Sequence, residues 1–89
     1  MPPNSDTAEA TVVLPAHLHA RPAGALTQLA TRFDSRIEII HAERTADPVG
    51  ILAIMSLGAV AGATITVRAH GTDAHNAVAE IVELLRVID

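Results

Sequence analysis

Four segments of the chain have the apolar pattern of strands. Residues 9–14 have a β-branched centre and end at a proline, and residues 36–41 place two isoleucines on one face. Residues 44–47 follow a turn and predict a short third strand, and residues 63–70 alternate with a period of two. Because apolar and polar positions alternate, we expect one face of the sheet to be buried and the other to face water.

Three further segments have the apolar spacing of helices. The first begins near residue 20, has a proline in its first turn and repeats apolar side chains at helical intervals. The second is short, spans residues 49–57 and ends at Gly58, a residue type that commonly terminates helices. The third begins after a turn in which Thr72 or Asp73 can cap it.

The order of these elements predicts the fold class. It is strand, helix, strand, strand, helix, strand, helix, and parallel strands would be more continuously apolar than these are. The sequence therefore predicts an α+β open-faced β-sandwich, in which three helices cover one face of the sheet. We expect residues 9–89 to form a single domain and residues 1–8, which are polar and contain prolines, to form a flexible N-terminal tail.

The composition narrows the classes of function. A chain of 89 residues forms one small domain, with no room for a deep substrate chamber. A single Phe and a net charge of −4 argue against stacking on single-stranded nucleic acid and against binding a phosphate backbone. The chain contains no Lys and no Cys, which excludes a Lys Schiff base, thiolate catalysis and disulfides.

The apolar stretches of the chain also indicate in which cellular compartment the protein lies. The N-terminus lacks the basic start and apolar run of a signal peptide. The longest apolar stretch, residues 49–63, is interrupted by glycines and is too short to span a membrane as one helix. We expect a cytoplasmic protein with no membrane insertion.

The five histidines differ in context. His41 and His70 end strands and His75 lies on the polar side of the last helix, so we interpret these three as surface imidazoles. His17 and His19 lie two residues apart in a loop with no carboxylate close in sequence. Since no pair has metal-ligand spacing on a helix face, we expect no metal site.

His19 stands immediately before the first helix, and Arg21 follows two residues later. The first N–H groups of a helix lack internal partners and carry partial positive charge, so this end can bind an anion. An imidazole there is a nucleophile beside a cradle for phosphate, and the Arg21 guanidinium adds donors for phosphoryl oxygens. The alternative is that His19 merely caps the helix, and the spacing alone leaves both interpretations open.

The chain resembles HPr, the histidine-containing phosphocarrier of the phosphoenolpyruvate-dependent phosphotransferase system. The likeness begins with Leu-His-Ala-Arg-Pro-Ala at residues 18–23, which is similar to the active-site motif of that family. Residues 51–58 resemble the family's second helix with its Met-Ser-Leu-Gly ending, and the strand near residues 64–69 is also similar. The resemblance covers about residues 9–88, nearly the whole chain.

This resemblance implies a four-stranded antiparallel sheet covered on one face by three helices. It implies that enzyme I phosphorylates His19 on Nδ1 and that an enzyme IIA component of a sugar transporter receives the phosphoryl group. Arg21 would stabilise the phosphoryl group, and the helix start at Ala20, Pro22 and Ala23 would cradle it. The protein would be a monomeric carrier without a cofactor, rather than an enzyme with turnover of its own.

Two positions near the site depart from the family pattern. Gly50 stands where many Gram-positive members carry a regulatory Ser, so we expect no serine-kinase control at this helix start. Ser56 matches a different Ser of the family, and we interpret it as structural. His17 replaces the usual Gly before Leu18, and it is either a bystander or a pH-sensitive modulator of the site.

The surface around the site also departs from the family, because many members surround it with Lys. Here we expect positive charge from Arg21 and, if it lies close enough, from Arg32. Partner binding should then rely more on apolar contact and less on charge. The expected docking residues are Val49, Ile51, Leu52 and Met55.

Two related functions remain as alternatives. The carrier could serve a specialised relay, such as a nitrogen-linked phosphotransferase or a dihydroxyacetone kinase chain, and nothing in the residues separates this from sugar uptake. A regulatory relative that carries no phosphoryl group is less compatible, because such proteins usually replace the active histidine and His19 is present.

Overall fold

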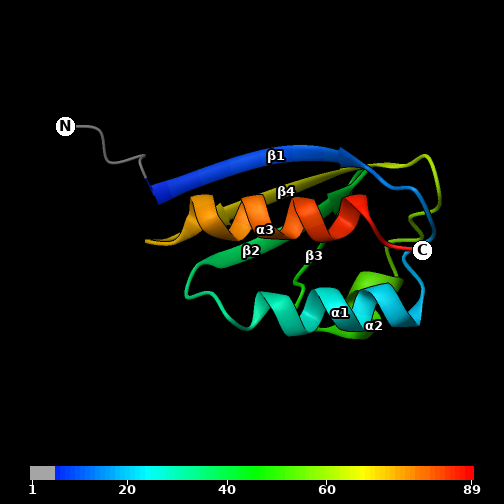
Figure 1. The fold of residues 1–89 in the computed structure, drawn as a ribbon, viewed down its shortest axis with the longest axis horizontal. Coiled ribbons are helices and arrows are strands. Elements are labelled where there is room, and N and C mark those ends of the chain that lie inside the picture. Colours follow the sequence, from blue (N-terminus) through cyan, green and yellow to red (C-terminus); the bar gives the residue numbers. More distant parts are fainter. Residues whose placement is uncertain (1–5) are drawn as a thin grey trace.

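The computed structural model describes residues 6–89, and four strands and three helices follow one another there in the predicted order (Figure 1). The predicted tail, residues 1–8, lies for the most part outside the described residues. The elements are β1 (Thr7–Val13), α1 (Ala20–Ala30), β2 (Arg36–His41), β3 (Arg44–Ala46), α2 (Ile51–Met55), β4 (Thr64–His70) and α3 (Ala74–Arg86).

The four strands form one antiparallel sheet in the order β1-β4-β2-β3. Strand β4 is central, where Val67 pairs with Ala10 of β1 and Ile39 of β2. On the open face of the sheet, Arg68 Nε donates to Glu9 Oε1 at 2.8 Å. The open-faced sandwich is thus confirmed, with one face carrying charged side chains and the other covered by helices.

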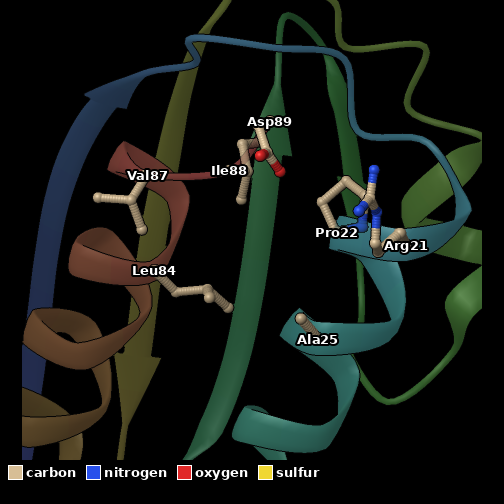
Figure 2. A pocket seen from close by; sticks show the side chains of 7 residues that line it. All are labelled: Arg21, Pro22, Ala25, Leu84, Val87, Ile88 and Asp89. Atoms are coloured by element: carbon tan, nitrogen blue, oxygen red, sulfur yellow. The ribbon is translucent and has the colours of Figure 1, made fainter.

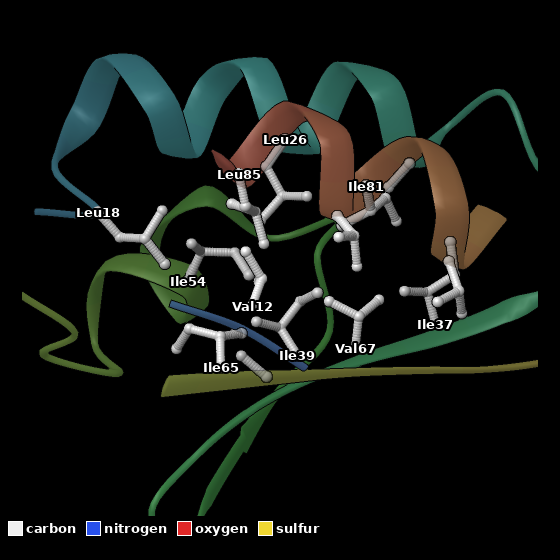
Figure 3. Packing of buried hydrophobic residues seen from close by; sticks show 14 of the residues in the cluster. Val12, Leu18, Leu26, Ile37, Ile39, Ile54, Ile65, Val67, Ile81 and Leu85 are labelled. Atoms are coloured by element: carbon white, nitrogen blue, oxygen red, sulfur yellow. The ribbon is translucent and has the colours of Figure 1, made fainter. Parts of the chain in front are cut away.

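The hydrophobic core lies between the sheet and the helices (Figure 3). On β4 the side chains of Ile65, Val67 and Ala69 are fully buried and alternate with more exposed ones, as the period of two predicted. Each Ile, Leu or Val side chain buried in this way contributes about 1.5–3 kcal/mol relative to its exposed state. Fully buried side chains from the helices pack against them, among them Leu26, Ile54, Ile81 and Leu85.

Two element boundaries differ from those expected. Strand β1 begins at Thr7 rather than at residue 9, because β4 extends to His70 and offers Thr7 and Ala8 pairing partners. Helix α2 is limited to Ile51–Met55. The residues before it form a turn instead of helix, in which Asp47 Oδ1 accepts from the Val49 N–H at 3.0 Å.

At one end of the domain, Asp73 in the β4–α3 turn joins that turn by hydrogen bonds to the segment before β2. Its carboxylate accepts from the N–H groups of Asp34 and Ser35, both at 2.9 Å, and from the Ser35 hydroxyl. These bonds lower the pKa of the Asp73 carboxyl, the Ser35 hydroxyl being the largest cause and the Asp34 N–H the next. The prediction that a side chain at this turn caps α3 is wrong, since Asp73 holds the N-cap position without a capping bond.

Gly71 packs closely against this linkage. Its φ of 144° lies in a region that side chains disfavour, and a Cβ there would stand 2.6 Å from Ser35 Oγ. The start of α1 and the end of α3 lie together at the other end of the domain (Figure 1). That second end contains the predicted site.

Candidate functional site

The segment before α1 is held against the loop that leads into β4. The Leu14 N–H donates to the Ala63 carbonyl at 2.9 Å, and the Leu18 N–H donates to the Ala59 carbonyl at 3.1 Å. Leu18 is buried in the core, with 4% of its surface exposed, whereas His17 and His19 on either side of it are exposed. Burial of Leu18 therefore turns both imidazoles outward.

His19 occupies the N-cap position of α1 in an extended conformation, with φ −84° and ψ −169°. Its carbonyl accepts from the Ala23 N–H at 3.0 Å, but its side chain makes no capping hydrogen bond. The interpretation of His19 as a simple helix cap is therefore wrong. The imidazole is exposed at the helix start and remains available for chemistry.

The helix start offers fewer backbone donors than the sequence suggests. Pro22 has no N–H group, and the Ala23 N–H is bonded to the His19 carbonyl. The first turn of a helix leaves its earliest N–H groups without internal partners, which here are those of Ala20 and Arg21. These two amides point along the partial positive end of α1 and can bind an anion.

Arg21 is exposed and borders a cavity of about 190 Å³ between the start of α1 and the end of α3. Figure 2 shows Leu84 of α3 pointing toward Ala25, and Val87 and Ile88, which follow α3, complete the lining on that side. The Arg21 side chain shares this cavity with Asp89. Arg32 follows the last turn of α1, so the expectation that it adds charge at the site is wrong.

His17 has a hydrogen bond that the sequence could not reveal. Its Nδ1 accepts from the Ala61 N–H at 3.2 Å, across 44 positions of the chain. The two histidines therefore differ, because a ring nitrogen of His17 is engaged and the His19 side chain has no hydrogen bond within residues 6–89.

The predicted docking residues surround the exposed side of α2, which lies beside α1 (Figure 1). Leu52 is the most exposed of them at 74%, and Ile54 on the opposite side of the helix is fully buried. We call the exposed set the α2 patch: Val49, Ile51, Leu52 and Met55.

The β2–β3 hairpin holds the segment that ends α2 through His41 and Arg44, neither of which was expected to make this contact. His41 Nδ1 donates to the Leu57 carbonyl at 3.0 Å, and Arg44 donates to the Ser56 carbonyl at 2.9 Å. The interpretation of His41 as a solvated surface imidazole is therefore wrong. The Ser56 hydroxyl donates to the Leu52 carbonyl at 2.7 Å, which fits the structural role expected of it.

Neither a metal cluster nor a membrane span is found in the part of the chain that the structure describes. Residues 6–89 contain no group of three or more His, Cys, Asp or Glu side chains that could hold a metal ion. No helix among the same residues is long and apolar enough to cross a membrane.

Comparison with known proteins places the fold and this helix start in one family. A family model described as "PTS HPr component phosphorylation site" matches residues 7–86. Since the match spans most of the chain, the chain belongs to the HPr family, the phosphocarriers of the phosphotransferase system.

Solved structures of HPr proteins agree with this assignment. HPr of Bacillus anthracis is 32% identical, covers 90% of this chain and 98% of its own, and has a TM-score of 0.83. The histidine-containing phosphocarrier of Mycoplasma is 33% identical, covers 88% and 89%, and has a TM-score of 0.76. An HPr of Thermoanaerobacter tengcongensis described as a dimer is 36% identical, covers 75% and 77%, and has a TM-score of 0.70.

Proposed function

We propose that His19 is the phosphoryl acceptor of this HPr-family chain, that enzyme I donates the phosphoryl group, and that an enzyme IIA component receives it in sugar uptake. The observation that carries the proposal is the exposed His19 imidazole at the start of α1, which has no hydrogen bond within residues 6–89, in a chain whose residues 7–86 match the family. We place this relay in the cytoplasm and propose that the carrier acts as a monomer.

The proposed step is a direct transfer between nitrogens. The lone pair of His19 Nδ1 attacks the phosphorus, a new P–N bond forms, and the P–N bond to the donor's histidine breaks, so no water takes part. The phosphoryl oxygens then lie near the Ala20 and Arg21 amides, and the Arg21 guanidinium can approach them from the edge of the cavity. Catalysis in such a transfer comes from positioning and charge stabilisation.

The test is phosphorylation by enzyme I and phosphoenolpyruvate, followed by intact-mass analysis. We expect one acid-labile phosphoryl group per chain, and none in His19→Ala. His70→Ala is the matched control, because His70 lies at the far end of β4 and should leave the yield unchanged. Label that persists in His19→Ala, or that maps to His17, contradicts the proposal.

We propose that both partners dock on the α2 patch, which lies along α1 from Ile51 beside Gly24 to Val49 near Ala30. With no Lys and a net charge of −4, the chain attracts an acidic surface weakly at long range. Apolar burial is not screened by salt and contributes about 25 cal/mol per Å² before the costs of association. Transfer should therefore depend only shallowly on salt.

Leu52→Asp tests this docking surface. The new carboxylate would be buried without a partner in the contact, and we expect transfer from enzyme I to slow at least tenfold. Val13→Asp is the control, because Val13 is also exposed, at 60%, but belongs to β1. Equal rates for the two variants, or a steep salt dependence, would show that charge rather than the α2 patch joins the partners.

The structure also bears on regulation by serine phosphorylation. Gly50 is the N-cap of α2 and has no hydroxyl. Ser56 stands at the opposite end of that helix, where its hydroxyl is bonded to the Leu52 carbonyl. We propose that no serine kinase controls this carrier at the start of α2.

A further inference from the structure

His17 connects the segment that carries His19 to the loop before β4. The loop, residues 58–63, contains glycine, alanine and valine, so it has no titratable side chain of its own. Backbone bonds join the two segments at Leu14 and Leu18, and the bond from the Ala61 N–H to His17 Nδ1 is the contact between them that depends on a side chain. It lies two residues from His19.

This hydrogen bond has one protonation requirement. Nδ1 can accept from an N–H only while it carries no proton, so the neutral His17 ring must carry its proton on Nε2. When the ring takes up a second proton, Nδ1 also carries a proton and becomes a donor. Two donors, Nδ1–H and the Ala61 N–H, then face each other. The bond is then lost, and a positive charge appears beside the acceptor segment.

The side-chain directions link this event to His19. In an extended segment, residues two apart lie on the same side, and here the residue between the two histidines is buried while both histidines are exposed. The other charged or titratable groups on the adjoining elements are Arg21 at the start of α1, Asp89 at the chain end, and His41 and Arg44, which are bonded to Leu57 and Ser56. Since residues 58–63 contribute none, His17 is the titratable group that contacts that loop.

We infer that His17 is a positioning residue for phosphoryl transfer: its neutral ring adds a bond that holds the acceptor segment against residues 58–63, and its protonation removes this bond, loosens the segment and slows transfer. This inference rests on the proposed role of His19 as acceptor. The sign is fixed by the geometry, because the bond is present when the ring is neutral and lost as the pH falls. Histidine is the side chain whose ordinary charge change falls between about pH 5 and 8, so rates measured at the two ends of that range test the sign.

Two variants separate positioning from a merely structural role. In His17→Asn the side-chain amide oxygen stands the same number of bonds from Cα as Nδ1, so it can accept from the Ala61 N–H but cannot titrate. In His17→Ala the acceptor is missing at every pH. Removal of one neutral hydrogen bond predicts a loss of about fivefold in rate.

The experiment measures the rate of transfer from phosphorylated enzyme I at about pH 8 and about pH 5.5. At the higher pH we expect His17→Asn to match the natural chain and His17→Ala to be about fivefold slower. At the lower pH the natural chain should fall to the rate of His17→Ala, and His17→Asn should be the faster by up to about fivefold. At each pH we compare the rates of the variants as ratios. Any effect of pH on enzyme I or on His19 is common to all variants and cancels in these ratios.

A second readout requires no phosphoryl transfer. In nuclear magnetic resonance spectra, the Ala61 amide signal should titrate together with the His17 ring nitrogens, and it should not titrate in His17→Asn. Rates of His17→Ala equal to those of the natural chain at high pH, or equal pH profiles for the natural chain and His17→Asn, overturn the inference. If no variant is phosphorylated at all, the proposed function fails, and the Ala61 titration still decides the hydrogen-bond switch.

Discussion

The two ends of the domain use their polar groups in opposite ways. At the β4–α3 turn, the Asp73 carboxylate accepts three hydrogen bonds from Asp34 and Ser35, and Gly71 packs against them. At the start of α1, the side chains of His19 and Arg21 are exposed and make no hydrogen bond within residues 6–89.

The two ends of α1 thus differ in role: we assign stability to the end with paired groups and phosphoryl transfer to the end with unpaired groups. Helix α1 begins at the end with unpaired groups and leads to the end where they are paired. Groups that already have partners cannot take on a phosphoryl group without losing those contacts. The closed end therefore fixes the sheet and helices in place, and the open end leaves its donors for the phosphoryl group that we propose it binds.

The largest expected effect on stability is the loss in Gly71→Ala. The new methyl group would stand 2.6 Å from Ser35 Oγ, at a φ of 144°, so we expect a loss of about 3 kcal/mol in the free energy of unfolding. Urea denaturation measures it. Gly62→Ala, at the open end, is the control: its φ is 90° but nothing lies within 4 Å, so only backbone strain is added. Equal losses in the two variants would show that the contact with Ser35 contributes nothing.

Unlike Gly71→Ala, Arg21→Ala should slow phosphoryl transfer and leave stability almost unchanged. An exposed Arg adds about 0–1 kcal/mol to stability, so the midpoint of unfolding should hardly move. A donor to a transferring phosphoryl group is worth about 2.7–4 kcal/mol in similar transition states, so transfer from enzyme I should slow well over tenfold. Arg32→Ala, beyond the far end of α1, should leave both quantities unchanged. A large loss of stability with normal transfer would reverse the roles we assign to the two ends.

The smallest effect is the pH dependence that Asp73 confers on stability. Its pKa is lowered in the folded chain, so the unfolded chain binds the proton more readily. The contribution of Asp73 is therefore complete above the ordinary Asp pKa of about 3.9 and is lost as the pH falls through the folded value. Asp73→Asn should lower the urea midpoint at neutral pH and flatten its decline in acid.

Asp34→Asn is the control for this experiment. It removes a charge from the facing α1–β2 connection but keeps the backbone N–H that bonds Asp73. It should retain the acid dependence of the natural chain. A decline in acid that survives in Asp73→Asn would assign that dependence to other carboxylates.

The sequence predicted the open end better than the closed one. His19, Arg21 and Pro22 lie within four consecutive positions, so a local motif and the physics of a helix start were enough to find them. The linkage of Asp73 to Ser35 and the bond of His17 to Ala61 join residues 38 and 44 positions apart. No periodicity reveals such pairs, because they depend on how the turns meet once the sheet has formed.

Element boundaries show the same limit. The alternation in residues 63–70 predicted the inward face of β4 because a period of two needs only the local sequence. Strand β1 extends to Thr7 because β4 supplies a partner there, and α2 is shorter than its apolar stretch because Asp47 holds the preceding turn. Both outcomes come from tertiary contacts that override local preference.

Helix α2 has a consequence for how the carrier is recognised. Five residues are far fewer than the roughly 12–15 that a helix needs to persist alone, and the N-cap Gly50 provides no side-chain bond. Its last carbonyl groups are bonded by local groups, the N–H groups of residues 56–58 and the Ser56 hydroxyl, while Arg44 and His41 bond the two carbonyl groups that follow the helix. A helix this short should open locally well before the domain unfolds. The surface offered to partners is then an ensemble of closely related shapes, and one short segment can fit a donor and a recipient that differ in outline.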